Sequence, residues 1–94
     1  MNSLEQIVID WVGANSKVID FGCGDGSLLK ALSLAKATTG YGVENDPQKI
    51  QDCIKNGMSV IQQDIDAGLL EYKNMGFDVA IMASSIQCLR KPKE

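Results

Sequence analysis

The 94-residue sequence contains no histidine, and this absence excludes several kinds of active site. A Ser-His-Asp triad, a histidine general base and a histidine-ligated zinc ion are all ruled out. Cysteines are few and far apart, because Cys23, Cys53 and Cys88 form no Cys-x-x-Cys pair. We therefore expect no metal site, and we predict free, mostly buried thiols in a reducing, cytoplasmic setting.

Positive charge is also scarce. Nine Lys and Arg stand against 12 Asp and Glu, which gives a net charge of −3. The only basic cluster is Arg90, Lys91 and Lys93, so the clustered basic surface of a nucleic-acid-binding protein is missing. No apolar run approaches the roughly 20 residues of a membrane span. We expect a protein that binds neither nucleic acid nor membrane.

The sequence does contain an alternation of helical and strand patterns. Periodicity predicts helices at 3–12, 27–36 and 47–56, strands at 17–21, 39–43, 58–62 and 77–83, and a short turn at 66–71. In the first helix, the predicted core stripe is Leu4, Ile7, Val8, Trp11 and Val12. Strands joined by helices of ~10 residues favour an α/β fold with a parallel sheet and right-handed crossovers.

Chemistry is expected at one edge of this sheet, because ligands of such folds bind outside the carboxyl ends of the strands. Asp20 to Gly26, Glu44 to Asp46, Asp64 to Asp66 and the residues from Ala83 onward follow strand ends. Residues 20–26 read Asp-Phe-Gly-Cys-Gly-Asp-Gly and connect a strand to a helix. Glycines in such a loop permit positive φ and let a ligand approach the backbone closely.

The acids of this loop argue against a phosphate ligand. The third glycine of the dinucleotide fingerprint would stand at position 27, which is Ser27. A pyrophosphate needs the positive end of the following helix, but Asp25 stands there and Asp20 flanks the loop. Carboxylates can instead accept hydrogen bonds from an ammonium group and from ribose hydroxyls. The loop therefore favours a cationic cofactor without phosphate, such as S-adenosylmethionine.

Two further acids fit the same cofactor. Glu44, at the end of the second strand, is expected to accept hydrogen bonds from both ribose hydroxyls. Asp64, at the end of the third strand, is expected to accept one from the adenine amino group, while Ile65 packs on the base. For other acids a structural role is an alternative to ligand binding. Asp46 is expected to cap a helix, and Asp25 either caps the second helix or contacts the cofactor.

Four segments in this order resemble the motifs of class I S-adenosylmethionine-dependent methyltransferases. Residues 18–26 resemble motif I, 42–46 the ribose-binding acidic motif, 63–65 the adenine-contacting motif, and 77–79 the start of motif IV. The resemblance implies a Rossmann-like sheet in which the loop holds the methionine part of the cofactor and the residues past the fourth strand lie beside the methyl group. The cofactor-binding residues are then Asp20, Phe21, Gly22, Cys23, Gly24, Asp25, Gly26, Glu44, Asn45, Asp64, Ile65 and Ala83. No residue is marked as catalytic.

A closer resemblance is to the methionine-biosynthesis MetW family, over residues 12–90. It is carried by Asp-Gly-Ser-Leu-Leu at 25–29, Gly-Tyr-Gly-Val-Glu at 40–44, the segment 57–64 and Ser-Ile-Gln at 85–87. This resemblance implies a role in methionine biosynthesis and homoserine O-acyltransferase as a partner. Two alternatives stay open: a small-molecule methyltransferase of another pathway, and a non-catalytic association module.

The length allows one domain over residues 1–94. Methyltransferases of this class have seven strands in the order 3-2-1-4-5-7-6, and this sequence supplies four, in the order 3-2-1-4. We therefore expect the cofactor-binding half of the fold, a partial domain. Its fourth strand, 79–83, would be an unprotected edge, which predicts self-association through that edge or a missing C-terminal half.

Overall fold

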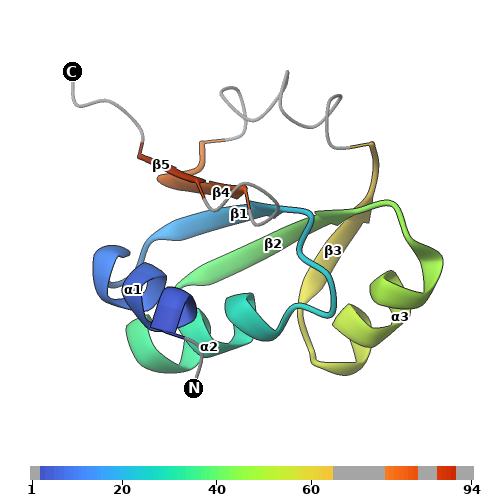
Figure 1. The fold of residues 1–94 in the computed structure, drawn as a ribbon, viewed down its shortest axis with the longest axis horizontal. Coiled ribbons are helices and arrows are strands. Elements are labelled where there is room, and N and C mark those ends of the chain that lie inside the picture. The colour runs from blue at the N-terminus through green and yellow to red at the C-terminus, as the bar shows by residue number, and fades with distance from the viewer. Residues whose placement is uncertain (1–2, 65–75, 83–86, 91–94) are drawn as a thin grey trace.

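Five strands form one sheet in the order β3-β2-β1-β4-β5 (Figure 1). A computed structural model describes residues 3–64, 76–82 and 87–90. Its helices are α1 (Ser3–Trp11), α2 (Ser27–Lys36) and α3 (Pro47–Lys55). Its strands are β1 (Lys17–Phe21), β2 (Thr39–Glu44), β3 (Ser59–Gln62), β4 (Val79–Met82) and β5 (Gln87–Arg90). Strands β1 to β4 are parallel, which confirms the α/β fold and the order 3-2-1-4.

Strand β5 corrects the prediction of an unprotected edge. It pairs antiparallel with β4, with Val79 opposite Arg90 and Met82 opposite Gln87. The free edge of β4 would leave a row of backbone N–H and C=O groups unpaired, and β5 satisfies them. The prediction that strand 79–83 forms an unprotected edge was therefore wrong, because β5 of the same chain already pairs with β4 there.

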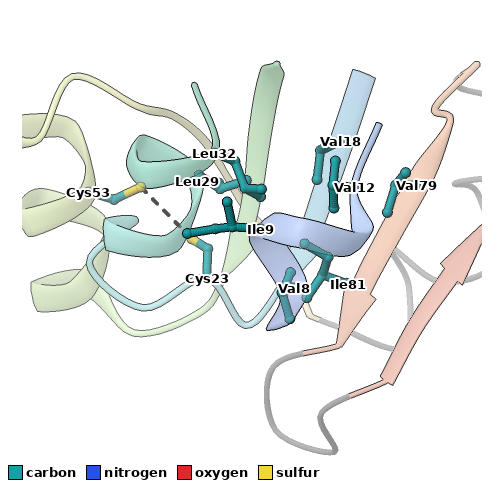
Figure 2. Packing of buried hydrophobic residues seen from close by; sticks show 10 residues of the cluster. All are labelled: Val8, Ile9, Val12, Val18, Cys23, Leu29, Leu32, Cys53, Val79 and Ile81. Carbon is teal, nitrogen blue, oxygen red and sulfur yellow. Dashed lines mark hydrogen bonds between the residues drawn. The ribbon is translucent and has the colours of Figure 1, made fainter. Parts of the chain in front are cut away.

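The three helices lie on one side of the sheet, below it in Figure 1. This placement follows from right-handed crossovers, since α2 joins β1 to β2 and α3 joins β2 to β3 in the same direction across the sheet. The helices and the sheet enclose the first core cluster (Figure 2). Its buried members are Val8, Ile9, Val12, Val18, Cys23, Leu29, Leu32, Cys53, Val79 and Ile81.

The buried face of α1 differs from the predicted stripe. Val8 and Val12 are buried as expected, but Ile9 is buried in place of Trp11, which is 38% exposed, and Ile7 is 61% exposed. Residues 7–9 are Ile-Val-Ile, so either of two adjacent helix faces satisfies the apolar period. Packing in the first core cluster selects the face with Ile9, whose side chain lies on the side of Leu29 and Leu32 of α2 (Figure 2).

The opposite side of the sheet carries a second buried cluster. Ile19, Phe21, Val43, Phe77 and Ala80 form it. Side chains alternate along a strand, so Val18 and Asp20 of β1 point to the helix side while Ile19 and Phe21 point away from it. After Lys17, strand β1 is thus buried on both faces, as expected for a parallel sheet, and Asp20 is its polar exception.

Some expectations concern residues outside the described part of the chain. These are the turn at 66–71 and the site residues Ile65 and Ala83. Of the cysteines, Cys23 and Cys53 are buried and free, as predicted, while the side chain of Cys88 is not among those described. Within the described residues, no helix is long and apolar enough to cross a membrane.

Gly42 of β2 leaves room for Cys23, because a side chain at position 42 would occupy the same place. A Cβ atom at Gly42 would collide with the Cys23 sulfur and lie 2.9 Å from its Cβ. Cys23 is buried between β2 and α3, so it has no free direction in which to move. The glycine therefore lets the segment after β1 lie directly on β2.

We predict that Gly42→Ala lowers the free energy of unfolding by about 1–3 kcal/mol, the usual cost of overpacking a core. Gly13→Ala is the matched control, since a Cβ there would meet only the Ser16 hydroxyl oxygen at 3.4 Å. Urea denaturation of both variants measures the difference. Equal stability of the two alanine variants would contradict the close packing of Cys23 on β2.

Candidate cofactor-binding site

The carboxyl ends of β1, β2 and β3 meet at one edge of the sheet. In the parallel register Phe21 lies beside Val43, and Glu44 lies beside Gln62. The segments after these strands are therefore neighbours. They contain the predicted site residues from Asp20 to Gly26, Glu44, Asn45 and Asp64.

The segment Gly22–Gly26, called the glycine loop below, folds back onto β2. The Gly22 and Cys23 N–H groups both donate to the Val43 carbonyl oxygen, at 2.7 and 3.3 Å. Gly22, Gly24 and Gly26 have φ values of 81°, 60° and 78°, in the left-handed region that favours glycine. The sequence folds this way locally because three residues of the loop carry no Cβ to oppose it.

Glu44 ties the glycine loop to the segment after β2. Its Oε1 accepts a hydrogen bond from the Gly24 N–H at 3.0 Å, and its Oε2 accepts from the N–H groups of Asn45 and Asp46 at 3.1 and 3.0 Å. A carboxylate offers about four acceptor positions. Counting the described residues, one of these stays open, which could take one ribose hydroxyl; a second hydroxyl would have to displace a backbone donor.

Most N–H groups of the loop are occupied by acceptors of the protein itself. Gly26 N–H donates to the Cys23 carbonyl at 3.0 Å, and Ser27 N–H donates to Asp25 Oδ1 at 3.0 Å. With the bonds to Val43 and Glu44, the donors engaged in this way are Gly22, Cys23, Gly24, Gly26 and Ser27. A phosphate cradle needs such groups directed at the ligand. The loop is therefore unsuited to a pyrophosphate.

Asp20 is a buried carboxyl group at the end of β1. Its side chain is 1% exposed, and its Oδ1 has no hydrogen-bond partner within the described structure. Burial first, and the nearby charge of Glu44 second, raise the pKa of Asp20 from its ordinary value of 3.8 to about 7. A buried acceptor without a partner is costly, and a cationic donor group from a ligand would supply the missing bond.

Several other predicted residues have structural roles. Asp46 caps α3, because its Oδ1 accepts from the Gln48 N–H at 2.9 Å, as expected. Asp25 is exposed and its Oδ1 accepts from the N–H of Ser27, the first residue of α2, while the N-cap position itself is Gly26. The Phe21 side chain lies in the second core cluster, which leaves its backbone for any ligand contact. Asp64 is exposed and follows β3 at the shared edge.

The thiol of Cys23 faces the core and not the ligand side of the loop. Its sulfur lies 3.9 Å from that of Cys53 on α3, and the two point toward each other (Figure 2). Burial raises the pKa of both thiols, which keeps them protonated and unreactive at neutral pH. The Cys23 side chain is therefore a buried packing residue, as predicted for the thiols, and only its backbone is left for the predicted cofactor contact.

One residue that contacts the loop was missed in the sequence. Asn56, at the end of α3, donates from Nδ2 to the Asp25 carbonyl oxygen at 2.7 Å. An Asn before a glycine at the end of a helix is common as a terminating residue, so nothing in the pattern pointed to a contact 31 residues away.

The fold and the loop define the class of protein: a Rossmann-like domain of the S-adenosylmethionine-dependent methyltransferase type. A TehB-like SAM-dependent methyltransferase from Corynebacterium glutamicum superposes with a TM-score of 0.64 at 19% identity, over 84% of this chain and 42% of that one. An RNA methyltransferase from Salinibacter ruber, in complex with S-adenosyl-L-homocysteine, gives 0.60 at 20% identity, over 83% and 53%. At these identities the likeness concerns the fold alone.

The family is narrower than the fold. A family model described as methionine biosynthesis protein MetW matches residues 3–94, and the chain belongs to the MetW family. A bifunctional methionine biosynthesis protein MetXA/MetW from Rhodopirellula baltica is 28% identical over 102 residues. The match takes in 100% of this chain and 16% of that protein.

Asp20 makes a testable contribution to the pH dependence of stability. Its pKa is raised in the folded state, so the folded chain holds more protons than the unfolded chain between pH 3.8 and about 7. Stability should therefore fall as pH rises through that window, by at most about 4 kcal/mol from this group. Asp20→Asn, which stays neutral, should remove this fall.

The measurement is urea denaturation at pH 4, 6 and 8. Relative to wild type, Asp20→Asn should gain stability steadily as pH rises. Asp10→Asn, at an exposed carboxylate of α1, is the control and should follow the wild-type profile. Parallel pH profiles for wild type and Asp20→Asn would contradict a buried, raised-pKa carboxyl at this position.

Proposed function

We propose that this chain binds S-adenosylmethionine at the glycine loop and acts in methionine biosynthesis as a MetW protein. The observation that carries the proposal is Asp20, 1% exposed, whose Oδ1 has no partner among the described residues and lies beside a loop with most of its N–H groups already occupied. Such an edge accepts hydrogen bonds and offers few, which suits an ammonium and ribose hydroxyls and opposes a phosphate. When bound, the cofactor supplies a methyl group on a positively charged sulfur.

The chain's residues divide between the two ends of the cofactor. Asp20 and the backbone of Phe21 to Gly26 take the methionine part. Glu44 accepts a ribose hydroxyl, and the exposed Asn45 beside it borders the same group. Asp64 is assigned to the adenine amino group. Ile65 is assigned to the adenine base and Ala83 to the methyl group. Both assignments rest on the sequence alone, because the two residues lie outside the described part of the chain.

Homoserine O-acyltransferase is the proposed partner. Support comes from the family and from the Rhodopirellula baltica relative, whose name joins MetXA and MetW in one protein. A cytoplasmic setting is proposed with it, and the free thiols Cys23 and Cys53 accord with a reducing compartment.

Methyl transfer by the chain itself is a second candidate function. Positioning of an acceptor in line with a sulfonium needs no catalytic base of the chain's own. The fold shared with methyltransferases favours this candidate, and the acceptor is unassigned. The pathway role and the transfer activity are therefore tested separately below.

The cofactor is tested by isothermal titration with S-adenosylhomocysteine. Wild type should bind it and should not bind NAD⁺ at the same concentration. Glu44→Gln should weaken binding about 10- to 100-fold, since it replaces an ionised acceptor by a neutral one, a loss of about 1.4–2.7 kcal/mol. Glu5→Gln, on α1, is the control and should bind as wild type does. Absence of wild-type binding at millimolar ligand would refute the proposal.

The partner is tested by co-purification. The tagged chain, mixed with the homoserine O-acyltransferase of the same cell, should retain it on the affinity resin and through gel filtration. The same mixture receives S-adenosylmethionine labelled in the methyl group, together with a small-molecule extract of that cell as the source of acceptors. Retention without transfer of label favours the MetW role, and label in a third molecule favours methyl transfer. Separate elution of the two proteins at tens of micromolar would remove the partner from the proposal.

A further inference from the structure

The C-terminal end of α3 is built against the glycine loop. Asn56 follows the last residue of α3 and is half-buried, and its backbone N–H donates to the Asp52 carbonyl at 3.0 Å. Its side-chain amide leaves the helix and donates to the Asp25 carbonyl at 2.7 Å. The main chain of the helix end thus fixes the place from which this donor reaches the loop.

This bond controls the orientation of one peptide plane. In a trans peptide the C=O and N–H groups point in opposite directions, so the Asp25 carbonyl and the Gly26 N–H form one rigid unit. Asn56 holds the oxygen, and the Cys23 carbonyl accepts from the Gly26 N–H at 3.0 Å. This plane turns about ψ of Asp25 and φ of Gly26, and Gly26, which has no Cβ, offers little steric resistance to that rotation. The two hydrogen bonds therefore fix the orientation of the peptide plane between Asp25 and Gly26.

Packing at the same helix end sets the distance between α3 and the loop. A Cβ on Gly26 would lie 2.7 Å from the Cys53 sulfur and 3.3 Å from a Met58 side-chain carbon. The Cys53 sulfur also lies 3.9 Å from that of Cys23, which belongs to the same loop (Figure 2). Gly26 is thus pressed against α3, and Asn56 bonds the adjacent carbonyl.

Helix α3 also connects the two ends of the proposed site. At its start, the Asp46 N–H donates to Glu44, and Glu44 accepts from the Gly24 N–H. At its end, Asn56 reaches Asp25. The glycine loop is consequently held at Gly24 through the ribose acid and at Asp25 through Asn56, with α3 as the rigid link between them (Figure 1).

We propose that Asn56 is a positioning residue for cofactor binding: it orients the glycine loop for the amino-acid part of the ligand. The adenosine part depends on Glu44, which Asn56 does not touch. The inference rests on the proposed function, because the loop is assigned to the methionine part of S-adenosylmethionine there. Loss of the Asn56 amide should therefore weaken ligands that carry the amino acid and spare those that lack it.

The test compares two ligands that differ only by that part. S-Adenosylhomocysteine carries the amino acid, and 5′-methylthioadenosine keeps the adenosine and the sulfur but lacks it. Asn56→Ala should weaken S-adenosylhomocysteine about 5- to 10-fold, the effect of one lost hydrogen bond, and change methylthioadenosine less than about 2-fold. Asn56→Asp, which keeps the shape but loses the donor, should behave in the same way.

Gln48→Ala is the matched control. Gln48 lies on the same helix and its amide also donates a side-chain hydrogen bond, to Asp52 at 3.2 Å, but it does not reach the loop. This variant should leave both ligands within about 2-fold of wild type. A merely structural role of Asn56 would instead weaken both ligands together, and that result would overturn the proposal.

Hydrogen exchange of the ligand-free chain supplies an independent readout. In Asn56→Ala the Gly26 amide should exchange faster, while amides in β1 and β2 keep their protection. Unchanged exchange at Gly26 would overturn the positioning role. If wild type binds neither ligand, the proposed function fails and the inference falls with it. If wild type binds both and Asn56→Ala keeps their affinity ratio, the inference alone fails.

Discussion

The carbonyl oxygen of Val43 is the acceptor on which the geometry of this edge depends. By accepting from Gly22 and Cys23, it brings the segment after β1 down onto the end of β2. Only then does Cys23 fill the space left by Gly42, and only then does Glu44 come within 3.0 Å of the Gly24 N–H. Two strand ends become one site because the backbone of the first is hydrogen-bonded to the backbone of the second.

The buried Asp20 carboxyl works against the stability of this arrangement. Every other described residue of β1 after Lys17 is a buried hydrophobe, and Asp20 is held at the same depth with an oxygen that lacks a partner. The neighbouring acid Glu44 adds repulsion to the cost of desolvation. A group that opposes the packing around it is expected where a site needs it, and the loop beside Asp20 is the site proposed above.

Sequence patterns predicted the parallel sheet well. They failed where two arrangements fit the pattern equally and tertiary packing decides between them. The run around Asp20 reads as a buried parallel strand with a glycine loop, since both signals are local. In α1 the pattern could not separate the face of Ile9 from that of Trp11. The four-residue β5 has no period of its own, and its pairing follows from the free edge of β4. Asn56 was missed because its contact is long-range.

The balance of donors and acceptors distinguishes this edge from that of a dinucleotide-binding fold with the same strand order. A pyrophosphate site presents N–H groups to the ligand, and the helix that follows adds a positive end. Here the loop's donors are turned to Val43, Cys23 and Glu44, and Asp25 occupies the start of α2. Within the described residues, what remains for the proposed ligand is an acceptor on Glu44 and the unpartnered oxygen of Asp20. On this proposal, ligand choice is set by which loop hydrogen bonds the protein makes to itself, more than by the topology of the sheet.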